Sequence, residues 1–426
     1  MKIFLDSIGC RLNQAEIERM AQQFRTAGHK IVGAAEDADL AVVNTCTVTS
    51  AAAADSRKVI RRAKNAGIDE IIATGCWVTM EPEKAAELSN RVVLNDEKEN
   101  LVSDFLNIPS ETFDLEPLER IPLPGLRSRT RAFIKVQDGC DNECTFCITT
   151  LARGEGHSRS IDEILADVRS ALDGGAKEIV LTGVHLGSWG QNFRHAPDLK
   201  LPLSELIKSI LEQTTAPRLR LSSLEPWDLE PDLFELWRDP RLMQHLHLPL
   251  QSGSDSVLRR MRRNTTRDEF RALVAAARAV LPYVAITTDI IAGFPGETEE
   301  EFAETLEFVQ EINFAGGHIF TYSPREDTPA ARMKGQLDKQ TRKARNATLR
   351  DAFAEMESRY RKIFVGKTMF VLWESSQNTE ESGWQMSGLT GNYLRVHATA
   401  SEPRWNQVDQ VKLLKVEGDV IMGEII

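Results

Sequence analysis

The chain has 426 residues, of which 42% are hydrophobic, and a formal net charge of -11 at pH 7. This length exceeds what one hydrophobic core usually supports, so we expect two or three domains. No apolar run approaches the roughly 18 residues needed to cross a bilayer, and the N-terminal "MKIFLDSIGC" reads as a strand, not as a signal peptide. We therefore expect a cytoplasmic protein with no membrane partner, and local basic patches would have to hold any nucleic acid.

Residues 1–108 alternate strand-like and helix-like segments, which predicts an α/β domain with a parallel, Rossmann-like sheet. The strand-like runs "KIFLDSIG", "LAVVNTC" and "EIIATGC" each end at or next to a cysteine: Cys10, Cys46 and Cys76. Right-handed crossovers place the carboxyl ends of parallel strands on one edge of the sheet, so these thiols should converge. A shared ligand explains this better than three unrelated buried cysteines do.

The segment "CDNECTFC" places three of the chain's six cysteines within eight residues. In a cytosolic chain such clustering favours metal or redox chemistry over disulfides. A structural zinc site has four protein ligands and no open position. His157, ten residues after Cys147, is a poor candidate for the fourth ligand. A [4Fe-4S] cluster held by Cys140, Cys144 and Cys147 would keep one iron open to a ligand that is not protein.

This cysteine spacing at the end of a strand, "RAFIKVQDGCDNECTFC", resembles the radical S-adenosylmethionine (SAM) superfamily. The resemblance implies that the open iron binds SAM through its amino and carboxylate groups. It further implies that an electron from the cluster cleaves SAM to a 5'-deoxyadenosyl radical, which removes hydrogen from an unactivated C–H bond. The three cysteines would then be catalytic ligands, and an electron donor such as flavodoxin or ferredoxin would serve them.

The stretch after this motif repeats a strand and helix pattern that predicts a partial (β/α)6 barrel over residues 131–337. The strand-like runs are "RAFIKVQ", "EIVLTGV", "RLRLSSLEP", "HLHLPLQ", "VAITTDIIAGFPG" and "GGHIFTYSP". Ligands of such barrels gather at the carboxyl ends of the strands. The candidate SAM-pocket residues there are Gly183, Glu225, Gln251, Gly293 and Gly296. The alternative is that the glycines only make turns and that Glu225 and Gln251 only cap helices.

The motifs "SIGCRLNQAEIE", "VVNTCTVT", "RGEGHSR", "LPLQSGSDSVLRRMRR" and "GFPGETEEEF" resemble the methylthiotransferases over nearly the whole chain. The resemblance implies two [4Fe-4S] clusters, with the first on Cys10, Cys46 and Cys76 carrying a sulfide that one SAM methylates and the second cleaving another SAM. Both open irons would face one cavity. The implied organisation is a cluster domain (1–108), a linker (109–130), a radical SAM barrel (131–337), a connecting helix (338–364) and an all-β TRAM barrel (365–426).

The strings "GCRLNQAE", "SRKVIRRA" and "RTRAFIKVQDGC" look most like the branch that modifies N6-threonylcarbamoyladenosine at position 37, in the anticodon loop of tRNA. Modification of N6-isopentenyladenosine, or of an aspartate in a ribosomal protein, is the alternative within the family. Candidate phosphate contacts are Arg57, Lys58, Arg61, Arg62 and Lys64 on one helix, and Arg259, Arg260, Arg262 and Arg263 in the barrel. Solvated helix faces explain these basic runs nearly as well.

The C-terminal segment departs from what an RNA-binding barrel needs. From Val365 onward it has five Lys and Arg against eight Asp and Glu, a balance better suited to a basic protein substrate. From a different functional class, the alternative is a non-catalytic nucleic-acid-binding protein whose cysteines hold zinc. That protein would be colourless, whereas two cubane clusters would give a brown protein with about eight irons.

Overall fold

The computed structural model describes residues 1–113, 130–196, 198–379 and 383–426. These residues form two compact units: Met1–Glu143 with Cys147–Thr215, and Cys144–Phe146 with Ala216–Ile426. We describe each unit by itself. Most of the linker expected at 109–130 lies outside the described residues.

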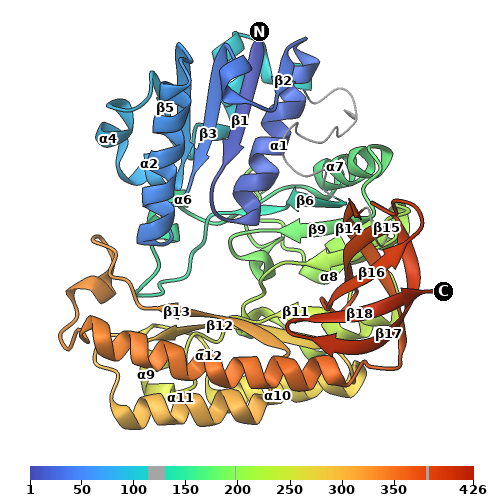
Figure 1. The fold of residues 1–426 in the computed structure, drawn as a ribbon. Helices are drawn as coiled ribbons and strands as arrows, with labels where there is room; N and C mark the ends of the chain where they lie inside the picture. Colours follow the sequence, from blue (N-terminus) through green and yellow to red (C-terminus); the bar gives the residue numbers. More distant parts are fainter. Residues whose placement is uncertain (114–129, 197, 380–382) are drawn as a thin grey trace. The chain divides into compact units, whose positions relative to one another are not determined.

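The first unit begins with a five-stranded parallel sheet in the order β2-β1-β3-β4-β5 (Figure 1). Its strands are β1 (Lys2–Ser7), β2 (Lys30–Val32), β3 (Leu40–Thr45), β4 (Glu70–Gly75) and β5 (Arg91–Val93). The helices between them are α1 (Arg11–Thr26), α2 (Ser50–Asn65), α3 (Cys76–Met80) and α4 (Pro82–Ala86), and α5 (Leu101–Leu106) follows the last strand. Two apolar cores lie on the sheet, one including Ile17 and Met20 of α1 and the other Ile60 of α2. The expected Rossmann-like domain is confirmed.

The same unit continues with the first part of the barrel. Strand β6 (Arg131–Lys135) pairs in parallel with β9 (Glu178–Thr182), and β7 (Gln137–Asp138) pairs with β8 (His157–Ser158). The helices are α6 (Thr149–Arg153), α7 (Ile161–Asp173) and α8 (Leu203–Gln213). A small apolar cluster of Ala15, Phe133 and Val180 joins α1 to β6 and β9. The N-terminal sheet and the start of the barrel therefore share packing within one unit.

The second unit holds the remaining barrel strands, β10 (Leu219–Leu221), β11 (His245–His247), β12 (Ala285–Ala292) and β13 (Gly316–Thr321). Strands β11, β12 and β13 are parallel neighbours, and bridges from Leu219 and Ser223 connect β10 to the β11 region. Their helices are α9 (Asp255–Arg260), α10 (Arg267–Val280), α11 (Glu299–Ile312) and α12 (Lys339–Lys362). Capping boxes at Thr266 and Thr298 begin α10 and α11, which explains why these boundaries are readable from sequence. Among the described residues, all six barrel strands fall within the expected runs.

Helix α12 leads into a closed barrel with the order β14-β15-β16-β18-β17. Its strands are β14 (Thr368–Thr379), β15 (Gly383–Thr390), β16 (Arg395–Ala400), β17 (Val408–Glu417) and β18 (Val420–Ile425). Inward side chains such as Trp373 and Val396 fill the core together with Phe364 from the end of the connecting segment. The expected small C-terminal barrel is confirmed. Within the described part of the chain, none of the helices combines the length and apolar character needed to cross a bilayer.

Candidate cluster sites

The cysteines of the first triad, Cys10, Cys46 and Cys76, follow three adjacent strands of the N-terminal sheet. Cys10 is the residue before α1, Cys46 directly follows β3, and Cys76 begins α3 after β4. Because β1, β3 and β4 are neighbours, their carboxyl ends lie side by side on one edge. Gly9 permits this approach, since a Cβ there would lie 2.6 Å from the Cys46 sulfur in a backbone with φ of +99°.

The buried Cys46 thiol resists losing its proton. Burial, together with the nearby thiols of Cys10 and Cys76, raises the pKa of Cys46 to about 11. A thiol must lose its proton to bind a metal, so the thiolates of this triad need a compensating positive charge. Arg153 provides it, because its charge acts on Cys46 and opposes the effect of burial.

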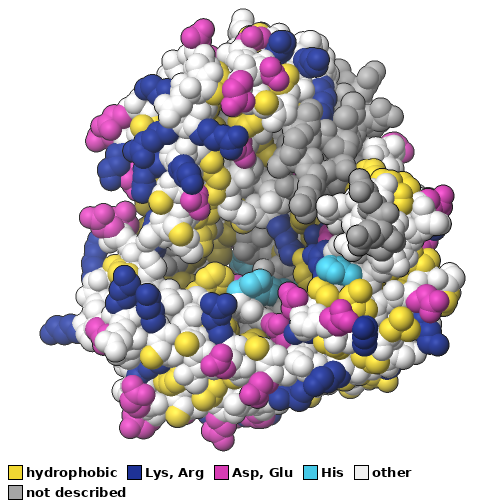
Figure 2. All heavy atoms as spheres, in the orientation of Figure 1, with side chains coloured by type: hydrophobic (Ala, Val, Ile, Leu, Met, Phe, Trp, Pro, Cys, Tyr) yellow, Lys and Arg dark blue, Asp and Glu magenta, His cyan; other side chains and the backbone are white. Residues whose placement is uncertain are grey.

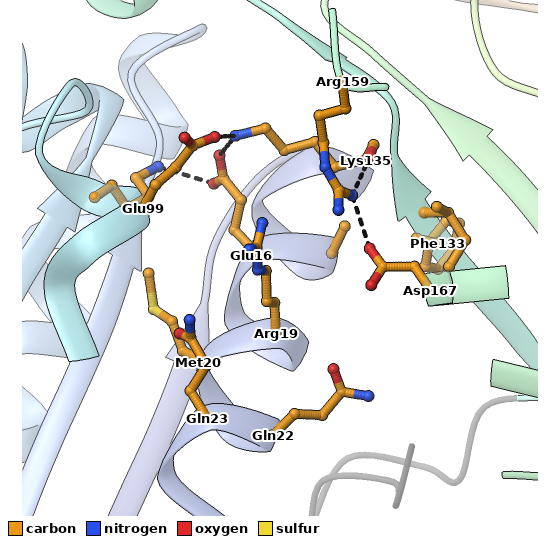
Figure 3. Close-up of a pocket in the computed structure, with 13 residues that line it drawn as sticks. Glu16, Arg19, Met20, Gln22, Gln23, Glu99, Phe133, Lys135, Arg159 and Asp167 are labelled. Atoms are coloured by element: carbon orange, nitrogen blue, oxygen red, sulfur yellow. Dashed lines mark hydrogen bonds and ion pairs between the residues drawn. The ribbon is translucent and has the colours of Figure 1, made fainter. Parts of the chain in front are cut away.

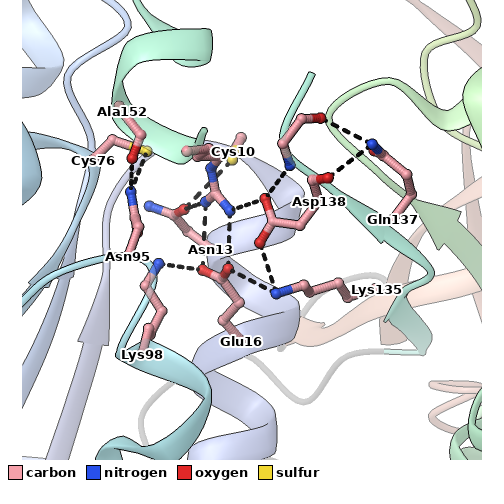
Figure 4. Close-up of polar contacts among 12 residues, drawn as sticks. Cys10, Asn13, Glu16, Cys76, Asn95, Lys98, Lys135, Gln137, Asp138 and Ala152 are labelled. Atoms are coloured by element: carbon pink, nitrogen blue, oxygen red, sulfur yellow. Dashed lines mark hydrogen bonds and ion pairs between the residues drawn. The ribbon is translucent and has the colours of Figure 1, made fainter. Parts of the chain in front are cut away.

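Arg153 lies in a buried network that connects α6 with α1 and β7. Figure 4 labels its partners Asn13, Glu16 and Asp138. Its Nη1 donates to Glu16 at 3.0 Å and to Asp138 at 2.8 Å, and its Nη2 donates to Asn13 at 2.6 Å. Only 2% of the Arg153 side chain is exposed. Asn13 in turn accepts from the Cys10 sulfur at 3.7 Å. The network therefore reaches the first triad through Asn13.

Two lysines complete this network. Lys98 contacts Glu16 at 2.8 Å, and Lys135 contacts Asp138 at 2.7 Å. Burial alone would raise the pKa of Glu16, but Arg153, Lys98 and Lys135 together hold it well below its usual value. The same lysines line a small pocket that opens to solvent between α1 and β6 (Figure 3). None of the described residues that line this pocket is a cysteine, so we assign it no part in the cluster chemistry.

Asn95 makes a second link between the first triad and α6. Its Nδ2 donates to the Cys76 sulfur at 3.7 Å and to the backbone carbonyl of Ala152 at 2.5 Å. Helix α6 begins two residues after Cys147. Asn95 therefore links Cys76 of the first triad to the helix that directly follows the second motif. Both contacts lie within the first unit.

The second motif, Cys140 to Cys147, forms a loop after β7. The backbone N–H of Cys140 donates to Gly154 O at 3.0 Å, and Gly139 lies so close to Glu155 that a Cβ would come 1.9 Å from its carbonyl oxygen. The backbone N–H of Asn142 points at the Cys140 sulfur at 3.5 Å. The loop therefore holds its first thiol by backbone contacts, which require glycine at position 139.

Cys144 contacts a buried arginine in the second unit. Arg263 Nη1 lies 3.7 Å from the Cys144 sulfur, and Nη2 donates to Glu225 at 2.6 Å. The guanidinium stacks over Trp227 at 4.4 Å from the ring centroid. Only 2% of the Arg263 side chain is exposed. Glu225, expected in the SAM pocket, is thus an ion-pair partner of the arginine beside Cys144.

The other predicted SAM-pocket residues lie at strand ends and are restricted by packing. Gly183 follows β9, where a Cβ would come 3.0 Å from Gln137 Oε1. Gln251 has φ of +72° and bridges Ile290 of β12. Gly293 and Gly296 both have positive φ, and a Cβ on Gly293 would lie 2.4 Å from the Arg342 side chain of α12. Chain packing therefore accounts for glycine at position 293 whether or not SAM lies beside it.

Sequence reasoning missed Asn13, Glu16 and Arg153 as site residues, although the first two lie inside the motif "SIGCRLNQAEIE". The available signal was a polar pair on the apolar face of α1, where both residues are buried. Sequence reasoning also placed Arg260 and Arg263 among the phosphate contacts. Arg260 instead forms an ion pair with Glu301 at 2.6 Å, and Arg263 is buried against Glu225.

The donor set fits iron-sulfur clusters. All six cysteines are free thiols, and they fall into two groups of three. Three thiolates per group leave one position of a cubane open, which suits a cluster that binds a further ligand. Backbone and side-chain N–H groups already point at several of the sulfurs, as they do around clusters in proteins.

Comparison with known proteins identifies the family. The Radical SAM superfamily model matches residues 134–309, and the model called Uncharacterized protein family UPF0004 matches residues 2–95. The chain is 35% identical over 422 residues to threonylcarbamoyladenosine tRNA methylthiotransferase MtaB of Bacillus subtilis (strain 168), covering 96% of this chain and 93% of the relative. The chain belongs to the radical SAM methylthiotransferase family. This methylthiotransferase also shares 38% identity with MtaB of Thermotoga maritima, over 87% of this chain and 86% of that relative.

A second group of relatives carries another substrate in its name. The tRNA-2-methylthio-N(6)-dimethylallyladenosine synthase of Anaplasma marginale is 30% identical over 97% of this chain and 94% of its own length. Among solved structures, the radical SAM methyltransferase TsrM from Kitasatospora setae, with cobalamin and a [4Fe-4S] cluster bound, matches with a TM-score of 0.58 at 14% identity, covering 78% of this chain and 77% of that one. This likeness supports the fold of the methylthiotransferase.

Proposed function

We propose that this methylthiotransferase adds a methylthio group to carbon 2 of N6-threonylcarbamoyladenosine at position 37 of tRNA. The observation that carries the proposal is the ranking of its relatives. Relatives named for threonylcarbamoyladenosine are 34 to 38% identical, whereas those named for dimethylallyladenosine are 28 to 30% identical. Both groups of relatives are named for tRNA, which favours a tRNA substrate over the ribosomal-protein alternative.

The enzyme uses two [4Fe-4S] clusters and SAM. We assign one cluster to Cys10, Cys46 and Cys76 and the other to Cys140, Cys144 and Cys147. When bound, these groups supply the methylated sulfur and the radical that removes hydrogen from the substrate. The chain's own part is to hold the two sites. Asn95 and the Arg153 network tie the first triad to α6, which begins just after the second motif.

The domain limits follow this division. Residues 1–108 would hold the first cluster, residues 131–337 the second cluster and SAM, and residues 365–426 would form the TRAM barrel, with residues 338–364 connecting them. Gly183, Glu225, Gln251, Gly293 and Gly296 remain the proposed SAM-pocket residues. Of these, Glu225 would act through Arg263, since it pairs with that arginine.

The tRNA contact falls on helix α2 in this proposal. Lys58, Arg61, Arg62 and Lys64 are exposed on it, and Figure 2 shows dark blue side chains gathered over this helix. Such cations contact phosphates and so position the RNA. An anticodon loop suits this reaction, because an unpaired base can be splayed into a pocket at modest cost. Since tRNA is the substrate and the thiols must stay reduced, we place the reaction in the cytoplasm, with a flavodoxin or ferredoxin as the electron donor.

The substrate is tested with three anticodon stem-loop RNAs that carry threonylcarbamoyladenosine, isopentenyladenosine or unmodified adenosine. After reaction with the reconstituted enzyme, the RNAs are digested to nucleosides and analysed by mass spectrometry. Only the first RNA should gain a methylthio group. Better reaction of the isopentenyl RNA, or methylthiolation of a ribosomal protein with no RNA product, would reject the proposed substrate.

The cluster assignment is tested by replacing each triad with alanine. Replacing Cys140, Cys144 and Cys147 should halve the iron content and abolish deoxyadenosine formation. Replacing Cys10, Cys46 and Cys76 should halve the iron but leave SAM cleavage measurable, because the second triad is intact. Loss of all iron from either triple variant would show that the triads do not hold separate clusters.

A further inference from the structure

Three polar side chains meet on the barrel strands of the second unit, outside the cluster motifs. His247, Asp289 and His318 lie on β11, β12 and β13, which are adjacent and parallel. The register pairs Asp289 directly with His318, and it pairs His247 with Thr287, two residues before Asp289 on the same face. We call these three residues the polar trio.

The trio lies on the strand face that points away from helix α12. A Cβ on Gly317 would come 2.4 Å from Phe353 of α12, so position 317 faces that helix. Side chains alternate along a strand, so His318 faces the opposite way. In β12 the pattern agrees, because Thr288 and Ile290 are buried while Thr287 and Asp289 are half-buried. The trio therefore lines the interior face of these barrel strands.

The contacts within the trio centre on one carboxylate oxygen. Asp289 Oδ1 lies 3.1 Å from His318 Nδ1 and 3.4 Å from His247 Nε2. The other ring nitrogen of His247 contacts Thr287 Oγ1 at 2.9 Å, which fixes the orientation of that imidazole. The side chains are 12% exposed at His247, 24% at Asp289 and 73% at His318. The trio is thus a connected polar group whose outermost member, His318, is open to a ligand.

The trio is close in the chain to residues that we expect in the SAM pocket. The Gln251 backbone N–H donates to Asp289 O at 2.8 Å, and Gly293 follows Asp289 by four positions on the same segment. Phe320, 43% exposed, lies beside His318 with ring centroids 6.3 Å apart. An exposed aromatic ring offers a base a stacking surface. The same face therefore provides stacking and polar contacts side by side.

We propose that His247, Asp289 and His318 form the subsite that recognises the threonylcarbamoyl group and so select the substrate. This inference rests on the function proposed above. The threonylcarbamoyl group carries a carboxylate, a hydroxyl and urea-type N–H and C=O groups. The ring nitrogen of His318 that faces away from Asp289, Nε2, donates to the carboxylate, and Asp289 accepts from the hydroxyl or an N–H. His247 contacts Asp289 and Thr287 with its two ring nitrogens and so holds Asp289 in place. The trio supplies both a donor and an acceptor, as this substituent requires.

The isopentenyl group of the alternative substrate is a hydrocarbon and has no atom that can form a hydrogen bond with the trio. Covering His318 and Asp289 with an isopentenyl group would remove their water without replacing its hydrogen bonds. Sites built to hydrogen-bond a polar group reject analogues that lack it far more strongly than apolar pockets reject an added group. The trio therefore favours threonylcarbamoyladenosine and disfavours isopentenyladenosine.

The test compares His318→Phe with the wild-type holoenzyme. We expect kcat/KM for the threonylcarbamoyl stem-loop to fall about 10- to 100-fold, because the phenyl ring cannot donate a hydrogen bond to the substituent. SAM cleavage without RNA is measured in the same variant, so that loss of RNA recognition is distinguished from damage to the SAM site. Fluorescence anisotropy gives a second readout: wild-type enzyme should bind the threonylcarbamoyl RNA more tightly than the unmodified RNA, and His318→Phe should abolish that preference. His195→Phe, the same change at an exposed histidine outside the trio, is the matched control.

Two further variants sharpen the result. Asp289→Asn should also abolish the preference, whereas Phe320→Ala should weaken the binding of all stem-loops alike. If wild-type enzyme does not modify the threonylcarbamoyl RNA, the proposed function fails. If it does, and His318→Phe and Asp289→Asn both keep the wild-type preference, the recognition subsite is wrong.

The trio's atoms also lie within 4.8 Å of one another and could bind a metal. Stoichiometric zinc or manganese that disappears in Asp289→Asn would therefore overturn the inference in favour of a metal site.

Discussion

Each cysteine triad has a buried arginine near it, yet the two arginines are held differently. Arg153 in the first unit is surrounded by Glu16, Asp138 and Asn13, and its charge acts on the thiols. Arg263 in the second unit pairs with the carboxylate of Glu225 and points an N–H at the Cys144 sulfur. A cluster on three thiolates would add negative charge at each site, and a buried cation nearby would compensate for it.

The difference between the two arginines indicates different tasks. Arg153 connects α1, α6 and β7, so its removal would disturb the framework that positions the first triad. Arg263 contacts a thiol directly, so its removal should chiefly change the electronic properties of the second cluster. From this comparison we expect Arg153, which contacts two carboxylates, chiefly to hold the fold, and Arg263, which contacts a thiol, chiefly to tune the proposed second cluster.

The largest effect should follow from Arg153→Met. This change removes the arginine that contacts both Glu16 and Asp138 and leaves only the two network lysines to balance these buried carboxylates, which costs up to about 3–5 kcal/mol of unfolding free energy. Urea unfolding followed by tryptophan fluorescence measures it. Arg194→Met is the control, because Arg194 pairs with Glu99 at 3.5 Å with half of its side chain exposed and should cost below about 1 kcal/mol. Similar costs in both variants would contradict the structural role of Arg153.

Arg263→Gln should leave the iron content near normal but lower the reduction potential of the second cluster. The reduced cluster carries more negative charge, which the Arg263 guanidinium stabilises, so reduction becomes harder without it. An EPR-monitored titration in a protein that lacks the first triad isolates this cluster. Arg259→Gln, at a neighbouring exposed arginine of α9, should leave the potential unchanged. An unchanged potential in Arg263→Gln would assign that arginine a packing role only.

Acid should weaken the first unit through the Arg153 network. The pKa of Glu16 is held below its ordinary value of 4.5 despite burial, and that of Asp138 lies well below 3.8. Carboxylates with a depressed pKa stabilise the fold above the ordinary value and lose this contribution as pH falls through the folded value. The urea midpoint of apoprotein should therefore drop steadily below pH of about 4.5. Glu16→Gln should show a smaller drop, and an equal drop in both proteins would exclude Glu16 as a source.

The smallest effect should come from the exposed cations of α2, which contrast with both buried arginines. Changing Lys58, Arg61, Arg62 or Lys64 singly to Gln should weaken stem-loop binding a few-fold and lower the salt slope by about 0.7–0.9 for each phosphate that the variant no longer neutralises. Fluorescence anisotropy at several salt concentrations measures both. Lys415→Gln, on the acidic C-terminal barrel, should change neither. A slope unaffected by the α2 variants would move the RNA surface elsewhere.

The local sequence pattern was enough to predict the main strands and helices of the fold. Parallel strands whose carboxyl ends carry cysteines predicted an edge where Cys10, Cys46 and Cys76 meet, and the sheet order places β1, β3 and β4 as neighbours. The C-terminal barrel over residues 365–426 was expected from the resemblance to the methylthiotransferases, and a closed barrel is found there.

The partners of individual charges could not be predicted in the same way. The run "LRRMRR" contains four similar cations, but Arg260 pairs with Glu301 and Arg263 reaches Glu225, 38 positions away. The polar trio is likewise assembled from three strands separated by helices. A sequence reports the local periodicity that creates strands, helices and their ends, because those depend on neighbouring residues. Which buried charges meet depends on contacts between distant segments, and only the tertiary structure decides them.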